Sequence, residues 1–193
     1  MKHTLRFNSP PDWNLEIRGR DFIGLCEVVT ILSDRFQSRG NLNMLEIGSF
    51  MGESTFMFAS SKLFDTITCI DPYDTSDNIP ELLGRTWNEV ETEFNINTRY
   101  FNNITLIKDF SYNVVDTLSD QSYDFIYIDG GHSYEDVKQD ILLTLPKLKQ
   151  GGIIAGHDYN PDYEGVIRAV NETVGKPEKV TVDNSWIKYI SSI

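Results

Sequence analysis

Four acidic residues of this chain stand where short apolar segments end and turns begin. They are Glu46, Asp71, Asp129 and Asp158. The carboxyl ends of parallel strands meet at one edge of an open sheet, and ligands bind in the crevice outside that edge. We therefore expect the four carboxylates to share one edge. Carboxylates in such a place can hold a cationic ligand or a metal ion, accept hydroxyl protons or orient a general base.

The segment that carries Glu46 has the pattern of a strand, a glycine turn and a helix. A short apolar run ends at Ile47, Gly48 and Gly52 follow, and residues 54–62 have helical spacing. Glycines let the backbone turn tightly and let a ligand approach it closely. The dinucleotide fingerprint G-x-G-x-x-G is absent from this turn. The pattern predicts a ligand-binding βα unit, with a turn that binds nothing as the alternative.

The charges around this turn indicate which kind of cofactor it binds. Glu46 lies at the end of the expected strand and Glu53 at the start of the helix. Two carboxylates would repel a pyrophosphate, which normally lies at this helix N-terminus. They would attract a cofactor that carries positive charge and no phosphate. S-adenosylmethionine has a sulfonium and an ammonium, so the sequence favours it over NAD.

Apolar periodicity predicts the elements that position these residues. The expected strands are residues 44–47, 66–70, 104–107, 123–128, 153–155, 179–182 and 186–190. The expected helices are 13–39, 54–62, 81–95, 112–118 capped by Ser111, one from Ser133 with Leu142 on its apolar face, and 163–174. This alternation predicts an α/β, Rossmann-like three-layer sandwich. Its seven-stranded sheet is mostly parallel with the last strand antiparallel, and helices cover both faces.

The length and composition fit one ordinary globular domain. The 193 residues divide into an N-terminal arm and helix, 1–40, and a Rossmann-like core, 41–193. A net charge of −12 argues against nucleic-acid partners. No apolar run approaches the roughly 20 residues of a membrane helix, and the N-terminus does not resemble a signal peptide. With Cys26 and Cys69 expected as thiols, we predict a cytoplasmic protein without a membrane partner.

These motifs resemble those of class I S-adenosylmethionine-dependent methyltransferases. Leu45-Glu46-Ile47-Gly48 with Gly52 resembles the first motif of that family, and Asp71 its second-strand acid. The run 123–134, followed by Leu148-Lys149-Gln150-Gly151-Gly152, resembles small-molecule O-methyltransferases related to macrocin-type sugar methyltransferases. The resemblance covers about residues 40–190. It implies O-methylation of a small hydroxylated molecule such as a sugar.

The resemblance also implies roles for individual residues in cofactor binding. The methionine end of the cofactor would lie against Glu46, Gly48, Ser49 and Gly52, with Asp129 nearby. Asp71 would hold the ribose, and it also lies 23 positions after Gly48, near the usual offset of a ribose-binding acid. Asp109 would lie near the adenine. The alternatives are a strand-end turn at Asp71 and a solvated turn at Asp109.

The residues that follow the fourth and fifth expected strands are candidates both for metal binding and for proton transfer. In metal-dependent relatives, the acid matching Asp129 and two adjacent residues after the fifth strand ligate a divalent cation. Here that pair is His157-Asp158, so Asp129 and Asp158 are the expected ligands of a divalent ion such as Mg²⁺, and His157 departs from the pattern. A hydroxyl nucleophile needs a base or a metal. We predict His157 or His132 as general base, with Asp129 assisting. The alternative is that His132 only caps a helix and His157 only binds a backbone carbonyl.

Three other functions stay open at this point, one of them an enzyme that uses a decarboxylated form of the cofactor, such as an aminopropyltransferase. The chain could bind S-adenosylmethionine without catalysing any transfer. It could also be an NAD-dependent oxidoreductase, although the expected fingerprint is missing. The sequence does not identify the methyl acceptor. It also leaves the oligomeric state open, and a homo-oligomer is one of the alternatives.

Overall fold

The structure is a computed structural model, and it describes residues 19–37, 41–74 and 84–191. The strands are β1 (Leu42–Ile47), β2 (Phe64–Ile70), β3 (Ile104–Ile107), β4 (Tyr123–Ile128), β5 (Leu148–Gly156), β6 (Lys179–Val180) and β7 (Trp186–Tyr189). The helices are α1 (Gly19–Phe36), α2 (Glu53–Ser60), α4 (Trp87–Thr98), α5 (Ser111–Val114), α6 (Tyr134–Thr144) and α7 (Glu164–Thr173). Short 3₁₀ turns are η1 (Val115–Thr117), η2 (Leu145–Lys147) and η3 (Pro161–Tyr163).

The seven strands form one sheet in the order β3-β2-β1-β4-β5-β7-β6. Neighbours from β3 to β5 pair in parallel, and β7 pairs antiparallel with both β5 and β6. The predicted mostly parallel sheet with an antiparallel last strand is therefore confirmed. Because β1 and β4 are neighbours whose connections leave in opposite directions, a crevice is expected at their carboxyl ends.

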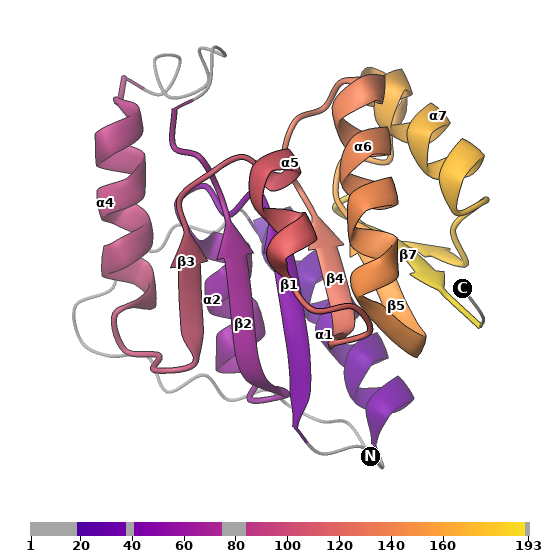
Figure 1. The fold of residues 1–193 in the computed structure, drawn as a ribbon, viewed down its shortest axis with the longest axis horizontal. Helices are drawn as coiled ribbons and strands as arrows, with labels where there is room; N and C mark the ends of the chain where they lie inside the picture. Colours follow the sequence, from indigo (N-terminus) through magenta and orange to yellow (C-terminus); the bar gives the residue numbers. More distant parts are fainter. Residues whose placement is uncertain (1–18, 38–40, 75–83, 192–193) are drawn as a thin grey trace.

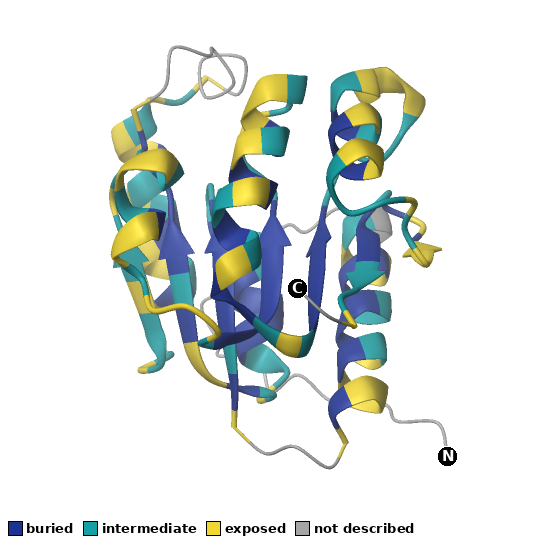
Figure 2. Ribbon diagram, turned by 45° about the vertical axis from the view of Figure 1, so that its right-hand side comes forward, coloured by how far each residue is buried: buried dark blue, intermediate teal, exposed yellow. Residues whose placement is uncertain are grey.

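Helices cover both faces of the sheet, as Figure 1 shows. Phe125 and Tyr127 of β4 belong to the core cluster that includes α1, α2 and α4. Ile126 and Ile128 alternate with them and pack with α6 and α7 on the opposite face. All of β4 is buried for this reason, and Figure 2 shows the buried strands between helices whose outer sides are exposed. A strand covered on both sides reads as a continuous apolar run.

The helix expected at residues 81–95 begins later than predicted. Gly84, Arg85 and Thr86 are not helical, and α4 starts at Trp87. Thr86 and Glu89 form a capping box, in which each side chain accepts from the other residue's backbone N–H. The capping box sets the start of α4. The prediction of an earlier start followed the apolar residues that precede Thr86 in the sequence. The predicted starts at residues 81 and 13, the end at 39 and the arm lie outside the described residues.

Two predictions of local detail were wrong. Ser111 does not cap α5; its hydroxyl donates to the carboxylate of Asp140, and α5 is only four residues long. Leu142 was expected on the apolar face of α6, but its side chain is 53% exposed. It follows the fully buried Ile141 by about 100° around the helix, so both cannot face the sheet.

The structure also bears on the predictions about the two cysteines and about membrane helices. Cys26 and Cys69 are both free thiols, and Cys69 is fully buried. Within the described parts of the chain, no helix combines the length and the apolar character needed to cross a membrane.

Candidate functional site

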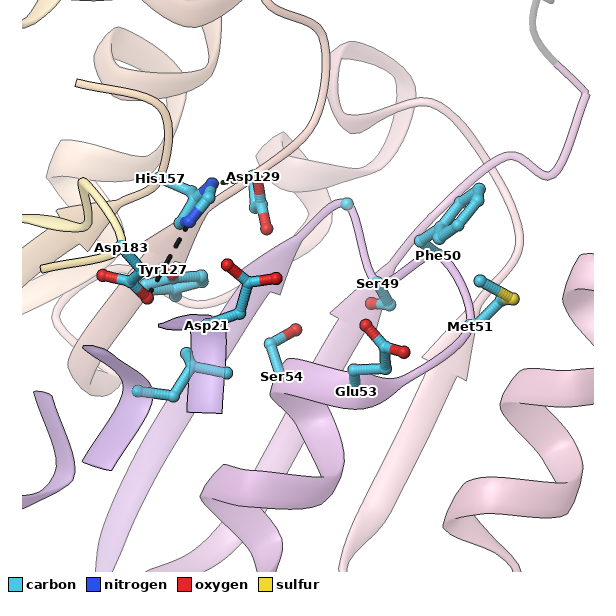
Figure 3. A pocket seen from close by; sticks show the side chains of 12 residues that line it. Asp21, Ser49, Phe50, Met51, Glu53, Ser54, Tyr127, Asp129, His157 and Asp183 are labelled. Atoms are coloured by element: carbon cyan, nitrogen blue, oxygen red, sulfur yellow. Dashed lines mark ion pairs between the residues drawn. The ribbon is translucent and has the colours of Figure 1, made fainter. Parts of the chain in front are cut away.

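A pocket of about 140 Å³ lies at the carboxyl ends of β1, β4 and β5, beside α1 and the start of α2. We call it the larger pocket, and Figure 3 shows the side chains around it. Its lining residues are Asp21, Leu25, Gly48, Ser49, Phe50, Met51, Glu53, Ser54, Tyr127, Asp129, His157 and Asp183. It occupies the switch point between β1 and β4, where such sheets bind their ligands.

Glycine is required where the β1 turn passes the end of β4. Gly48 has a φ of +81°, and a Cβ built there would lie 2.1 Å from the backbone oxygen of Asp129. Gly52 also has a φ of +81° and precedes the first residue of α2. Any larger residue at position 48 would push the turn away from Asp129. The two loops that bound the pocket are thereby held against each other.

Ser49 is the polar group of this turn that lacks a partner. Its side chain is 2% exposed, and its hydroxyl oxygen has no hydrogen-bond partner among the described residues. Buried hydroxyls are normally satisfied, because an unpaired one costs about 1–3 kcal/mol. A hydroxyl in this state at the wall of a pocket is suited to bind a polar ligand.

Asp71 binds the turn itself. One carboxylate oxygen accepts from the backbone N–H groups of Ser49 and Phe50, both at 2.9 Å, and the other accepts from Tyr73 N–H at 2.9 Å. Phe50 and Tyr73 have positive φ values, 44° and 47°, which non-glycine residues rarely adopt. Asp71 does not line the larger pocket. Its observed contacts hold a strained loop, and its role at a ribose stays a prediction.

Glu46 lies behind the pocket wall. It is fully buried, and it accepts hydrogen bonds from Ser54 at 2.7 Å, from Thr55 and from the Cys69 thiol at 3.4 Å. Burial raises the pKa of Glu46 to about 7, although these hydrogen bonds oppose the rise. Of the acids used in the charge argument against a pyrophosphate, only Glu53 faces the pocket. Glu46 acts on it through the hydroxyl of Ser54, which does line it.

Two histidines and two acids meet at the ends of β4 and β5. His157 Nδ1 lies 3.2 Å from Asp158 Oδ1 and 3.9 Å from Asp129 Oδ1. His132 Nε2 lies 3.0 Å from the other oxygen of Asp158. Asp158 has a positive φ of 62°, a strained conformation of the kind that clusters at functional sites. The sequence predicted all four of these residues as site residues, and the fold brings them together.

The ion pairs shift the pKa values of this group. Burial lowers the pKa of His157, but the hydrogen bond to Asp158 and the nearby carboxylates outweigh it and raise the pKa to about 9. The hydrogen bond to Asp158 also raises the pKa of His132. Burial raises the pKa of Asp129 to about 6. Burial acts in the same direction on Asp158, but hydrogen bonds from both histidines hold its pKa well below the ordinary value.

One subset of these side chains has the spacing of a metal site. Ligand atoms of Asp129, His132 and Asp158 all lie within 4.8 Å of one another. They line a second, smaller pocket, bounded also by Gly130 and Trp186. The structure thus brings the two expected ligands, Asp129 and Asp158, together and adds His132. Two carboxylates and one imidazole form a mixed oxygen and nitrogen donor set.

Several residues that line the larger pocket were not predicted as site residues, among them the acids Asp21 and Asp183. Asp183 lies between the expected strands 179–182 and 186–190, and Asp21 lies in the expected helix 13–39. His157 Nε2 lies 3.8 Å from Asp183 Oδ2, whose carboxylate is completely buried. Gly24 makes room for it, because a Cβ there would lie 1.9 Å from Asp183 Cγ. The spacing of Asp21 and Gly24 on one helical face was the available signal.

Asp109 lies away from both pockets. Its carboxylate accepts from the backbone N–H of Phe110 at 2.7 Å and from the Asn113 side chain at 2.8 Å. These contacts are those of a turn that leads into α5. The adenine role of Asp109 stays a prediction.

The chain is similar to known proteins over most of its length. A family model described as a methyltransferase domain matches residues 45–159, more than half of the chain. Uncharacterized protein R132 of Acanthamoeba polyphaga mimivirus is 30% identical over 164 residues, which are 81% of this chain and 69% of that protein.

Solved structures share the fold. CalS11, a TDP-rhamnose 3'-O-methyltransferase of calicheamicin biosynthesis, aligns with a TM-score of 0.61 at 15% identity, over 91% of this chain and 82% of its own. An O-methyltransferase from Bacillus cereus in complex with SAH aligns with a TM-score of 0.57 at 15% identity, over 86% of this chain and 81% of its own. At such identities the similarity concerns the fold alone.

Proposed function

The chain belongs to the methyltransferase-domain family, and we propose that it is an S-adenosylmethionine-dependent enzyme that methylates a hydroxyl group of a small molecule such as a sugar. The family match confirms the resemblance drawn from the sequence. The observation that carries the proposal is the larger pocket, because it joins the glycine turn of β1 to His157 and Asp129. The oxidoreductase alternative is not supported by this family.

The residues of the pocket fit this methyl donor. Gly48 keeps the wall open at the turn, the Ser49 hydroxyl is unpartnered, and Glu53 faces the pocket with a carboxylate. Ser54 donates to Glu46, so its oxygen lone pairs are free to accept from an ammonium group. S-adenosylmethionine supplies a methyl group already activated on a sulfonium. The protein's task is then to orient the acceptor hydroxyl and to remove its proton.

His157 is the better candidate for the general base. It lines the larger pocket, whereas His132 lines the smaller one and binds Asp158. A base must be neutral before it accepts a proton, and the pKa of about 9 favours the imidazolium of His157 in the free protein. Positive charge entering the pocket opposes that imidazolium and lowers the pKa. Asp129 and Asp158 then orient the ring through its Nδ1 side.

We further propose that Asp129, His132 and Asp158 hold a divalent cation. Their ligand atoms are close enough for one ion, and carboxylates with an imidazole suit Mn²⁺ better than Mg²⁺. A bound ion would lower the pKa of the acceptor hydroxyl. His157 would stay outside this ligand set and keep its place at the larger pocket. Dialysis against a chelator followed by metal titration, read by calorimetry, tests whether these residues bind an ion.

Binding and turnover together test the proposed function. Calorimetry should show binding of S-adenosylmethionine and S-adenosylhomocysteine, and none of NAD. Incorporation of a labelled methyl group into a panel of sugars and phenols should then identify an acceptor. Failure to bind either donor form overturns the proposal. Donor binding without transfer to any hydroxyl would instead favour a binding protein that lacks catalysis.

Two histidine variants separate the catalytic candidates. His157→Gln should reduce turnover by about a hundredfold or more and leave donor binding unchanged, because a base acts only on the acceptor proton. His132→Gln should weaken metal binding and reduce turnover less. Retained turnover in His157→Gln would exclude it as the base.

The remaining predictions about partners are unchanged. The net charge of −12 supports a function without nucleic acid. A cytoplasmic location stays a prediction, and the oligomeric state stays open.

A further inference from the structure

The segment that connects β5 to α7 contacts His132 at three points. Asp158 Oδ2 lies 3.0 Å from its Nε2, and the ring of Tyr163 packs against the imidazole with the ring centroids 4.9 Å apart. Gly165 comes so close that a Cβ there would lie 3.1 Å from the His132 carbonyl oxygen. We propose that Tyr163 is a positioning residue that holds the His132 imidazole in place as a ligand of the divalent cation. This inference rests on the proposed function, because the cation is part of it.

The His132 ring lacks the hydrogen bond that usually orients a metal-bound imidazole. A histidine that ligates a metal normally donates its other ring N–H to a carboxylate, a carbonyl or water. Among the residues that the structure describes, the Nδ1 of His132 has no such acceptor. The side chain is also 32% exposed, so the surrounding protein leaves the imidazole room to rotate. A contact with the face of the ring can restrict this rotation instead.

The contact with Asp158 does not serve this purpose once an ion is bound. Nε2 is the nitrogen of His132 turned toward the other proposed ligands, because it lies 3.0 Å from Asp158 Oδ2. A nitrogen that ligates a metal ion carries no proton, so Nε2 loses its hydrogen bond to Asp158 when it becomes a ligand. The packing of two rings does not depend on that proton. The contact with Tyr163 can therefore hold the imidazole both before and after the ion binds.

Tyr163 is itself fixed by the loop that carries Asp158. Asn160 N–H donates to the backbone oxygen of Asp158 at 2.8 Å, and Tyr163 N–H donates to the backbone oxygen of Asn160 at 3.0 Å. The side chain of Asn160 accepts from Asp162 N–H at 2.9 Å, and Pro161 restricts the backbone at the start of η3. These bonds connect a proposed ligand to the ring that packs on the next ligand.

The ring of Tyr163, and not its hydroxyl, makes the observed contact. The hydroxyls of Tyr134 and Tyr159 bind side chains of α7, whereas that of Tyr163 has no hydrogen-bond partner among the described residues. The side chain of Tyr163 is 37% exposed, so its replacement should cost little stability. Phenylalanine should therefore preserve the function of Tyr163, and leucine, which has no aromatic face, should not.

The test measures Mn²⁺ binding to the 193-residue chain by calorimetry, after dialysis against a chelator. The proteins are the wild type, Tyr163→Leu, Tyr163→Phe and, as a matched control, Tyr112→Leu, at an exposed tyrosine that lines neither pocket. Tyr163→Leu should weaken Mn²⁺ binding about tenfold, because loss of a residue that orients a ligand typically costs about 10–100-fold in metal affinity. Tyr163→Phe and Tyr112→Leu should stay within about twofold of the wild type.

A double-mutant cycle separates positioning from general damage to the loop. Tyr163 acts through the His132 ring, so Tyr163→Leu should change Mn²⁺ affinity by less than about twofold when His132→Ala is already present. Equal losses in both backgrounds, a loss in Tyr163→Phe as large as in Tyr163→Leu, or wild-type affinity in Tyr163→Leu would overturn the proposal. If His132→Ala binds no Mn²⁺, the comparison of Tyr163→Phe with Tyr163→Leu decides alone.

Donor binding keeps this proposal apart from the proposed function. Tyr163→Leu should bind S-adenosylhomocysteine as the wild type does, which also shows that the variant is folded, and Tyr163→Met replaces it if it is not. A wild type that binds S-adenosylhomocysteine but no Mn²⁺ overturns the role of Tyr163 and leaves the methyltransferase proposal standing. A wild type that binds Mn²⁺ but neither form of the donor refutes the proposed function, and the Tyr163 variants still decide the role of that residue.

Discussion

Asp71 and Asp129 follow β2 and β4, the two strands that flank β1 in the sheet, yet their surroundings are opposite. The carboxylate of Asp71 accepts from three backbone N–H groups and is 6% exposed. The carboxylate of Asp129 is 29% exposed, lines both pockets and lies 3.9 Å from His157 Nδ1. One acid is saturated by the loop that it holds. The other is partly desolvated and still available to a ligand.

This difference indicates how to separate acids that hold a loop from acids that can meet a ligand in such a sheet. Backbone amides that bind a carboxylate stabilise its charged form and a single loop conformation. A carboxylate that is buried without such donors has a raised pKa, as Asp129 has at about 6. Position at a strand end is shared by both residues and does not distinguish them. The number of backbone N–H groups that donate to the carboxylate does distinguish them.

The largest effect expected from this comparison is a loss of stability in Asp71→Ala. Three backbone N–H groups would lose their acceptor, and two strained residues would lose the contact that holds them, so the free energy of unfolding should fall by about 4 kcal/mol. Urea denaturation measures it. Asp65→Ala, at an exposed acid of the same strand, should change stability by less than about 0.5 kcal/mol. Equal stability of the two variants would show that Asp71 is not structural.

Glu46 is an intermediate case, because hydroxyls and a thiol bind it in place of backbone amides. Its pKa of about 7 lies above the ordinary 4.5, so the folded state binds the proton more tightly and stability falls as pH rises from about 4.5 to 7. Raised pKa values of Asp129 and Asp140 act in the same direction. Glu46→Gln should reduce the loss of unfolding free energy between pH 4.5 and pH 8 by about 3 kcal/mol. Urea titrations at several pH values would contradict this if wild type and variant fall in parallel.

Asp129→Asn should show the reverse of Asp71→Ala. We expect turnover to fall about a hundredfold, because the variant loses a negative charge beside His157 and one proposed metal ligand. The free energy of unfolding should stay the same or rise, since a half-buried charge is removed. Methyl-transfer assays and urea denaturation measure the two effects. Asp116→Asn, at an exposed acid in η1, is the control, and an Asp129→Asn protein that unfolds more easily would make Asp129 resemble Asp71.

The smallest effect is expected at Gly24, where α1 meets the pocket acid Asp183. A Cβ there would lie 1.9 Å from Asp183 Cγ, and that side chain is fully buried and cannot easily move. Overpacking costs about 1–3 kcal/mol, and the higher helix propensity of alanine offsets about 1 kcal/mol of this. Gly24→Ala should therefore lower the unfolding free energy by about 1 kcal/mol. Ser33→Ala, exposed on the same helix, should not lower it; a stabilised Gly24→Ala would mean that α1 does not press on Asp183.

The sheet and most of its elements were predictable from local patterns. The run 123–128 is apolar except for Asp124 because both faces of β4 are covered, and its predicted bounds are those observed. The predicted helix start at Ser133 is confirmed, because Ser133 caps α6 by accepting from Asp136 N–H. The start of α4 was missed, because a capping box acts on two residues while the periodic signal extends over many. Asp129, Asp158 and both histidines were predicted as site residues because they follow the ends of two expected parallel strands, and such ends meet at one edge of the sheet.

The sequence by itself determined the architecture and the residue types at the carboxyl edge of the sheet, because hydrophobic alternation and glycine turns are local properties. Only the tertiary structure decided which carboxylates are saturated and which face the pocket. Asp71 depends on backbone amides that a folded loop presents, and Asp21 approaches Asp183 from the other end of the chain through Gly24. Hydrogen-bond saturation and contact across the sheet depend on distances in space, and spacing along the sequence does not encode them.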